Sequence, residues 1–213
     1  MAAVIDSDQH LVEYRGFWRE HLDPSLRDDA IELVDDAAGW TWITWRGERL
    51  GLAEAQTPGE TGVIGDRHQQ ALRGDACDVR FDDALPLDHW NPAARRDALA
   101  ALGADEAMLF PNFGLLWERR LGADPMVQLA HMRAWNRWCV TVADEGQGRL
   151  HPVGHLHLRD AAWLDDELRS LAAAGVRTAM IAPSLVDGRP LSHPSLDRVW
   201  SAFEHHGVSP VFH

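Results

Sequence analysis

Two acidic residues and a histidine alternate near the start of the chain. The segment Asp6-Ser7-Asp8-Gln9-His10 begins where a short apolar run, residues 3–6, predicts a buried strand. Because strand side chains alternate between two faces, Asp6, Asp8 and His10 can point to the same side. A carboxylate and a neutral imidazole two residues apart can bind one divalent cation together. The same spacing also fits a polar strand end with a capping aspartate.

Other histidines occur in strand-like segments. His213 follows the apolar run Pro210-Val211-Phe212, in the position where barrel enzymes place ligands and bases. The alternative is a histidine without a role at that position. His155 and His157 share one face of a further strand, as two metal ligands would. We expect them instead to fill polar layers of a barrel or to lie near its mouth.

Other kinds of chemistry find little support. His205 and His206 precede Gly207 at the predicted end of a helix, where a favourable interaction with the helix dipole explains them. No Gly-x-Ser-x-Gly elbow is present, and neither Cys77 nor Cys139 lies in a nucleophile motif. The two cysteines also form neither a disulfide framework nor a metal knuckle.

From about residue 91 onward, predicted strands alternate with predicted helices. Together with the N-terminal strand this gives five strands, which indicates βα units and a parallel sheet. Such a sheet is either an open doubly wound sheet or a barrel. No Gly-x-Gly-x-x-Gly follows a strand, so a dinucleotide-binding fold loses its best signal. The later strands are expected at residues 107–110, 151–158, 178–182 and 209–213, and the helices at about 92–103, from 125, 161–175 and 194–207.

The chain between the first two barrel strands behaves differently. A helix is predicted over residues 24–37, with Gly39 as its stop. Three tryptophans around Arg46-Gly47 predict a hairpin. Residues 57–88 are rich in Gly, Asp and Pro, so we interpret about 40–90 as an insertion or an active-site loop region.

Composition limits the classes of protein. The 213 residues are 46% hydrophobic, which predicts one globular domain, slightly short of the ~250 residues of a complete barrel. The net charge of −13 argues against a nucleic-acid partner. No apolar run approaches the ~20 residues of a membrane span, and the N-terminus does not resemble a signal peptide, so we expect a cytoplasmic protein without a membrane partner.

Taken together, the chain resembles the amidohydrolase-related proteins (amidohydrolase family 2) of the aminocarboxymuconate-semialdehyde decarboxylase type. The order and spacing match over about residues 3–38 and 88–213, and residues 40–90 match only loosely. The segments that carry the resemblance are Val4-Ile5-Asp6-Ser7-Asp8-Gln9-His10-Leu11-Val12-Glu13, Leu109-Phe110-Pro111-Asn112-Phe113-Gly114, Ala134-Trp135-Asn136-Arg137-Trp138, Asp187-Gly188-Arg189-Pro190-Leu191 and Pro210-Val211-Phe212-His213.

The resemblance implies an α/β fold of the TIM-barrel, metal-dependent hydrolase type. One divalent metal, zinc or manganese, would lie at the carboxyl ends of the strands. Asp8 and His10 match the strand-1 ligands of the family, and His213 matches its strand-5 histidine. An acid at Asp8 resembles the decarboxylase and hydratase branches more than the two-metal hydrolases.

The match covers about five βα units of a (β/α)8 barrel. The family's strand-6 catalytic histidine and strand-8 aspartate have no counterpart in residues 1–213, so the catalytic residues are expected beyond His213. We therefore expect an incomplete barrel, from a fragment, a truncated reading frame or an incomplete gene product. Alone, it is expected to be inactive or nearly so and to aggregate or form a homodimer through its open edge.

The resemblance also implies a reaction class. A complete protein would be a carboxy-lyase or hydrolase acting on a small aromatic or unsaturated carboxylate. The alternatives are a lactone or amide hydrolase, and a non-catalytic remnant that has lost its activity.

Overall fold

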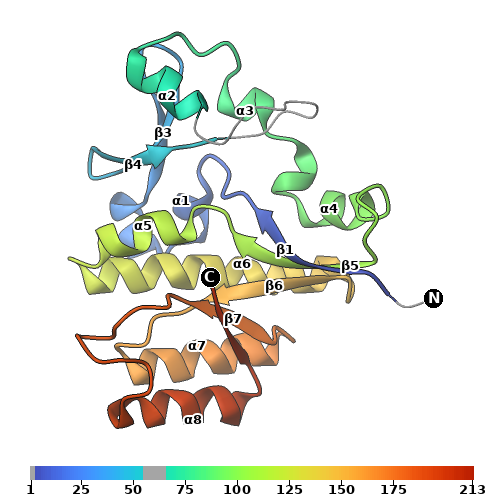
Figure 1. The fold of residues 1–213 in the computed structure, drawn as a ribbon, viewed down its shortest axis with the longest axis vertical. Helices are drawn as coiled ribbons and strands as arrows, with labels where there is room; N and C mark the ends of the chain where they lie inside the picture. The colour runs from blue at the N-terminus through green and yellow to red at the C-terminus, as the bar shows by residue number, and fades with distance from the viewer. Residues whose placement is uncertain (1–2, 55–65) are drawn as a thin grey trace.

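Five parallel strands form the main sheet of the computed structural model, which describes residues 3–54 and 66–213. The sheet order is β1-β5-β6-β7-β8, and every neighbouring pair is parallel. The sheet curls into a half-barrel (Figure 1), and the predicted sequential order of parallel strands is confirmed. The strands are β1 (Ile5–Leu11), β5 (Glu106–Pro111), β6 (Leu150–His155), β7 (Thr178–Ile181) and β8 (Ser209–Phe212).

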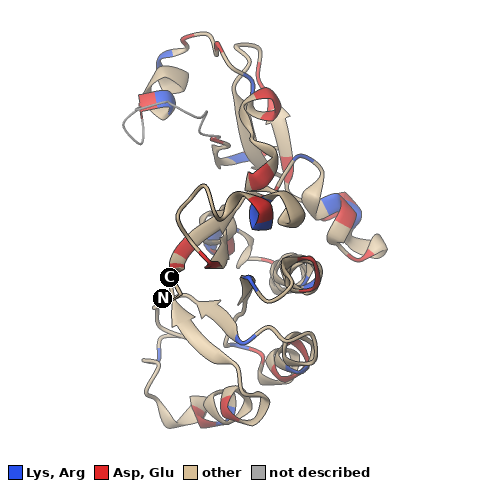
Figure 2. Ribbon diagram, turned by 90° about the vertical axis from the view of Figure 1, so that its right-hand side faces the viewer, with Lys and Arg blue, Asp and Glu red and all other residues tan. Residues whose placement is uncertain are grey.

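Helices connect these strands and lie on the outer face of the sheet, stacked along one side in Figure 2. The predicted caps are present: the Asp124 and Asp160 side chains accept backbone N–H groups at the starts of α6 and α7. Gly207, with φ of 63°, ends α8. The helices are α4 (Pro92–Ala98), α5 (Gly114–Leu121), α6 (Pro125–Gly146), α7 (Ala161–Ala173), the 3-10 helix η3 (Pro194–Leu196) and α8 (Asp197–His206).

The prediction of a helix over residues 24–37 is wrong. A 3-10 helix, η1 (Pro24–Asp29), is followed by the strand β2 (Glu32–Asp35). Ala30 is already extended, with ψ of 144°, and Leu33 pairs with Ile43 of the next strand. Leu33, part of the apolar spacing that suggested a helix, is therefore buried from a strand instead. The pairing of β2 with the next strand overrides the weak local preference for a helix.

The predicted tryptophan hairpin is confirmed. It comprises β3 (Thr41–Trp45) and β4 (Glu48–Leu52), which form an antiparallel sheet in the order β2-β3-β4. Both turn residues, Arg46 and Gly47, have positive φ (49° and 80°), as the tight hairpin turn requires.

The remaining short elements lie around this second sheet and before β5. They are α1 (Phe17–His21), α2 (Asp66–Arg73), α3 (Phe81–Ala84) and the 3-10 helix η2 (Leu87–His89). Residues 55–65 of the proposed 40–90 region lie outside the described residues, and the treatment of 40–90 as an insertion stays a prediction. No helix within residues 3–54 and 66–213 is long and apolar enough to cross a membrane.

Apolar side chains fill both faces of the main sheet. The large outer cluster includes Trp18, Trp117 and Trp135. A smaller cluster, Phe110, Val153 and Met180, lies on the opposite, inner face with Met108 and Val211 beside it. The inner face of the half-barrel is therefore packed with side chains, as in barrel cores generally.

A buried histidine ties the long helix α6 to the start of β2. His131 Nε2 accepts the Ile31 backbone N–H (3.1 Å), and its Nδ1 lies 2.8 Å from the Val127 carbonyl oxygen. Both contacts are satisfied only by the neutral imidazole with its proton on Nδ1. Burial lowers the pKa of His131 to about 4.

Acidification should therefore destabilise the protein through His131. Its folded pKa lies below its usual value of 6.5, so the unfolded chain binds more protons between these values. Its contribution to stability should be present above pH 6.5 and be lost as pH falls through about 4. Urea unfolding measured between about pH 7 and about pH 4 checks this, because the range spans both the usual histidine pKa and the lowered pKa of His131. The His131→Gln variant should show a shallower loss, and an unchanged pH slope in this variant would contradict the assignment.

Candidate metal centre

Asp8, His10 and His213 come together at the carboxyl edge of the main sheet. One ligand atom from each lies within 4.8 Å of the other two. Asp8 Oδ1 is 3.6 Å from His10 Nε2 and 3.5 Å from His213 Nε2. Asp8 and His10 lie on β1, and His213 directly follows β8, so residues about 200 positions apart meet because the sheet curls.

The spacing of the three side chains fits a divalent cation. Ligand atoms ~2.0–2.1 Å from a tetrahedral zinc are about 3.4 Å from one another, close to both Asp8–imidazole distances. Two imidazole nitrogens and one carboxylate oxygen are a donor set that suits zinc. Burial, followed by the charge of His213, lowers the pKa of His10, which favours the neutral imidazole that metal binding needs.

An aromatic ring supports the two imidazoles. The Phe110 ring stacks on His213, with centroids 4.6 Å apart and an interplanar angle of 24°, and lies 5.9 Å from the His10 ring. Phe110 is 3% exposed and belongs to the inner apolar cluster. The packed ring therefore restricts the rotation of His213 and sets the position of both imidazoles.

Asp6 does not join this group, although the strand alternation allowed it. Three steps along β1, from Asp6 to Gln9, match two steps along β5, so a bulge breaks the alternation. The Asp6 carboxylate instead accepts hydrogen bonds from Gln9 Nε2 (3.0 Å) and the Asp8 backbone N–H (3.1 Å). Gln9 in turn accepts a hydrogen bond from Arg95 (3.0 Å), and this network fixes the strand on which Asp8 and His10 lie.

His155 and His157 lie outside the three-residue group. His155 is 0% exposed, and Asn136 binds both its backbone N–H (2.8 Å) and its carbonyl oxygen (3.1 Å). His155 Nε2 lies 3.0 Å from Glu118 Oε2. His155 lowers the pKa of Glu118 against the opposing effect of burial, so Glu118 is an ionised acceptor and the His155 Nε2–H donates. His155 Nδ1 has no hydrogen-bond partner among the described residues.

Sequence reasoning missed the helix that carries Glu118. α5 begins at Gly114. A Cβ added at Gly114 would lie 2.8 Å from the Pro111 ring, so the helix start packs closely against Pro111. Glu13, which follows β1 and is 1% exposed, accepts the Phe113 backbone N–H at 2.9 Å. Burial raises the pKa of Glu13 to about 8. A glycine after Pro111-Asn112-Phe113 was the sequence signal for this helix start, but a buried glutamate 100 residues away was not visible as its partner.

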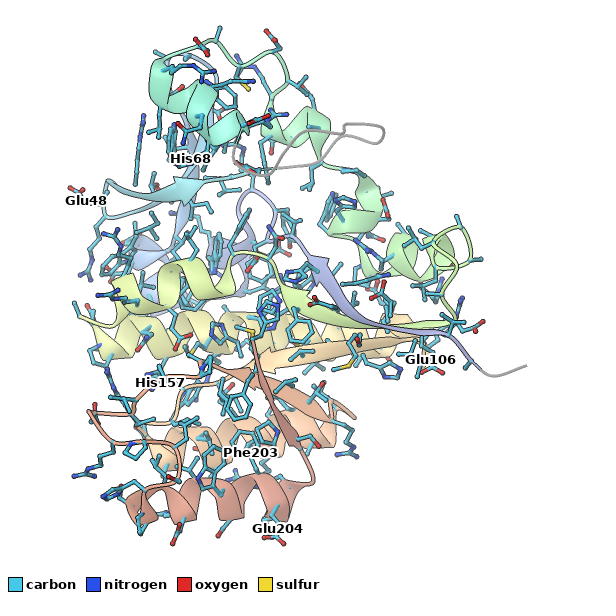
Figure 3. The ribbon with its side chains drawn as sticks, in the orientation of Figure 1. Glu48, His68, Glu106, His157, Phe203 and Glu204 are labelled. Carbon is cyan, nitrogen blue, oxygen red and sulfur yellow. The ribbon has the colours of Figure 1, made fainter. Side chains whose placement is uncertain are left out.

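A pocket of about 450 Å³ opens beyond β6 and β7 at the same edge of the sheet. Its walls come from α5, from the segment after β6 and from the segment after β7. Figure 3 shows His157, which lines the pocket, and Glu106 at opposite ends of the sheet. The pocket therefore shares the carboxyl edge with the Asp8–His10–His213 group, where barrel enzymes place their active sites.

Comparisons with known proteins support the fold. No family model matches the chain, and no curated protein matches it. Its structure is similar to that of an amidohydrolase from Mycobacterium avium subsp. paratuberculosis K-10, with a TM-score of 0.72 and 24% sequence identity. The alignment covers 99% of this chain and 58% of that protein, so this chain spans less than two thirds of its length. At this identity the similarity establishes the fold of the corresponding part of an amidohydrolase.

The Glu118–His155 pair should stabilise the fold far more than a comparable exposed pair. Glu118→Ala would leave the buried Nε2–H of His155 without an acceptor, a loss of about 1–3 kcal/mol in the free energy of unfolding. The Glu106–His151 pair, with side chains 33% and 43% exposed, is the matched control. Glu106→Ala should change the free energy of unfolding by at most about 1 kcal/mol. Urea unfolding of both variants measures the difference, and equal losses would contradict the structural role of Glu118.

Proposed function

We propose that this chain belongs to a metal-dependent enzyme of the amidohydrolase superfamily, in which Asp8, His10 and His213 bind zinc or manganese. The proposed reaction is that of a carboxy-lyase or hydrolase on a small aromatic or unsaturated carboxylate, as in the aminocarboxymuconate-semialdehyde decarboxylase branch. The observation that carries the proposal is the meeting of these three side chains, from the first and last strands, at the carboxyl edge of the sheet.

The chain's own residues would prepare this centre. Asp8 supplies a carboxylate with a 71% exposed side chain, and the two imidazoles, each 30% exposed, leave one side open to a substrate. Phe110, which is packed in the inner apolar cluster, stacks on His213 from the inner side. A bound cation would supply Lewis-acid polarisation of a substrate oxygen and a lowered pKa for water.

A hydrolase of lactones or amides is the second candidate. The structural relative from Mycobacterium avium subsp. paratuberculosis K-10 is described as an amidohydrolase, which favours hydrolysis over decarboxylation. Both reactions use the same three ligands, so product analysis distinguishes them. A chain without any metal affinity would instead support a non-catalytic role.

Replacement of Asp8 should weaken metal binding, whereas replacement of an equally exposed aspartate away from the site, Asp97, should not. Asp8→Asn weakens one of the three ligands. It should lower zinc affinity by at least about ten-fold in calorimetric titration, because even the loss of a residue that only hydrogen-bonds to a metal ligand has an effect of about this size. Asp97→Asn is the matched control, because the Asp97 side chain is also 71% exposed but lies on the outer helix α4 and pairs with Arg96, so the affinity should stay within about two-fold. Equal affinities in wild type and Asp8→Asn would refute the proposed centre.

Turnover should depend on the same ligands. The chain, and any longer product of its gene, are loaded with zinc or manganese and assayed with hydroxybenzoates for CO2 release and with lactones and amides for hydrolysis. We expect turnover by the longer product and little or none by residues 1–213, because the resemblance assigns a further histidine and aspartate to other barrel strands. His10→Gln should abolish the activity, and His206→Gln should preserve it, since His206 binds Asp165 on the outer helices. Comparable turnover by residues 1–213, or full activity of His10→Gln, would contradict this account.

A further inference from the structure

The pocket beyond β6 and β7 combines an apolar wall with basic groups. Its apolar lining comes from both strand ends and includes Leu156, Leu158, Ile181 and Val186. Arg119, Arg159 and His157 supply the basic and hydrogen-bond-donating part of the lining. A volume of about 450 Å³ lies within the range of small-molecule sites.

The proton of His157 can be placed from its contacts. The Arg159 backbone N–H donates to His157 Nδ1 at 3.1 Å, so this nitrogen is an acceptor. Burial lowers the pKa of His157, which favours the neutral ring. The neutral ring then carries its proton on Nε2, and within the described parts of the chain no hydrogen-bond partner is found for this N–H. His157 therefore offers a donor to a ligand in the pocket.

The two arginines differ in how they are engaged. Arg159 Nε binds Asp187 at 2.8 Å, which joins the segment after β6 to the segment after β7. Arg119 is exposed, and its side chain makes no ion pair or hydrogen bond with residues 3–54 and 66–213. Its guanidinium is available to an anion, for which the planar fork of N–H donors is suited.

One acidic group lines the same pocket. The Glu118 side chain is 12% exposed and is held by the His155 Nε2–H at 3.0 Å. His155, His157 and Arg159 all lower the pKa of Glu118, so its carboxylate is ionised and already compensated by positive or donating neighbours. An anion would be repelled from Glu118 and directed to Arg119 and the His157 N–H.

We propose that this pocket binds the carboxylate of a small organic acid through Arg119 and the His157 Nε2–H, with its apolar body against Leu156, Leu158 and Ile181. This assignment rests on the proposed function, because it identifies where the carboxylate substrate is held at the edge of the sheet that carries Asp8, His10 and His213. In this proposal the carboxylate is the anchor of the substrate and is not itself a ligand of the cation held by the three residues.

Three ligands of one shape test the charge preference. Benzoate, benzamide and benzylamine are titrated into the chain in the presence of EDTA, and methyl resonances of Leu156, Ile181 and Val186 are followed by NMR. We expect benzoate to shift these resonances and to bind at least about five-fold more tightly than benzamide, equal to about 1 kcal/mol. Tighter binding of benzylamine would show that Glu118 dominates, and equal binding of benzamide would show an apolar pocket alone. Either result overturns the proposal, as does the absence of shifts in these methyl groups.

Matched variants test the two residues. Arg119→Gln and His157→Phe should each weaken benzoate binding by about five-fold or more. Arg120→Gln is the matched control, because it removes the same charge from the same helix. Arg120 is exposed and lies outside the pocket lining, so this variant should change benzoate binding by less than about two-fold. Unshifted resonances far from the pocket confirm that each variant is folded, and an Arg119→Gln protein that binds benzoate like wild type refutes the assignment.

The failure of this inference is distinguishable from failure of the proposed function. Benzoate binding is measured without metal, and zinc binding is measured without benzoate. Benzoate binding with no zinc affinity would leave the pocket assignment intact and overturn the metal centre. Zinc binding with no charge-dependent benzoate binding would do the reverse.

Discussion

The parallel pairing of five strands in sequential order is the constraint on which the candidate site depends. Parallel strands carry all their carboxyl ends to one edge, and the curl of the sheet brings the ends of β1 and β8 together. Asp8 Oδ1 and His213 Nε2 thus lie 3.5 Å apart, although β1 and β8 are at opposite ends of the strand order. The same edge carries the pocket beyond β6 and β7. An antiparallel sheet would have divided these groups between two edges.

A buried glutamate, Glu13, and a partly buried one, Glu118, connect this edge to the rest of the fold through α5. Glu13 binds the backbone just before the helix, and Glu118 on the helix binds His155 at the end of β6. Asn136 on α6 fixes the backbone of His155 from the outer side. Glu13, Asn136 and His155 are buried, and each of these polar groups is paired, so displacement of α5 would leave unsatisfied polar atoms in the core. The pocket wall is therefore held by directional contacts as well as by apolar packing.

The parts of the fold that follow from local chemistry were predictable from the sequence. Asp124 and Asp160 identify two helix starts, and the tight turn at Arg46-Gly47 identifies the hairpin. The strand β2 was mistaken for a helix because its pairing with β3 is set by residues outside the segment. The Asp8, His10 and His213 positions were predicted from strand ends and the resemblance, and the structure brings them together. Glu118 was missed because the importance of a glutamate on a surface-like helix comes from His155, 37 residues away.

The charge distribution explains why a local basic group matters in so acidic a protein. With a net charge of −13, the overall field of the chain repels carboxylates rather than attracting them. The carboxylate substrate that we propose would therefore have to be held by short-range donors that outweigh this field where it binds. Most arginines are already engaged, as Arg15 is with Asp35 and Asp82. Arg119 differs because it combines an accessible guanidinium with the wall of a pocket whose one carboxylate, Glu118, is occupied by His155. In the proposed site, the hydrogen bond from His155 to the ionised Glu118 would offset part of the repulsion that an anion meets at this edge of the sheet.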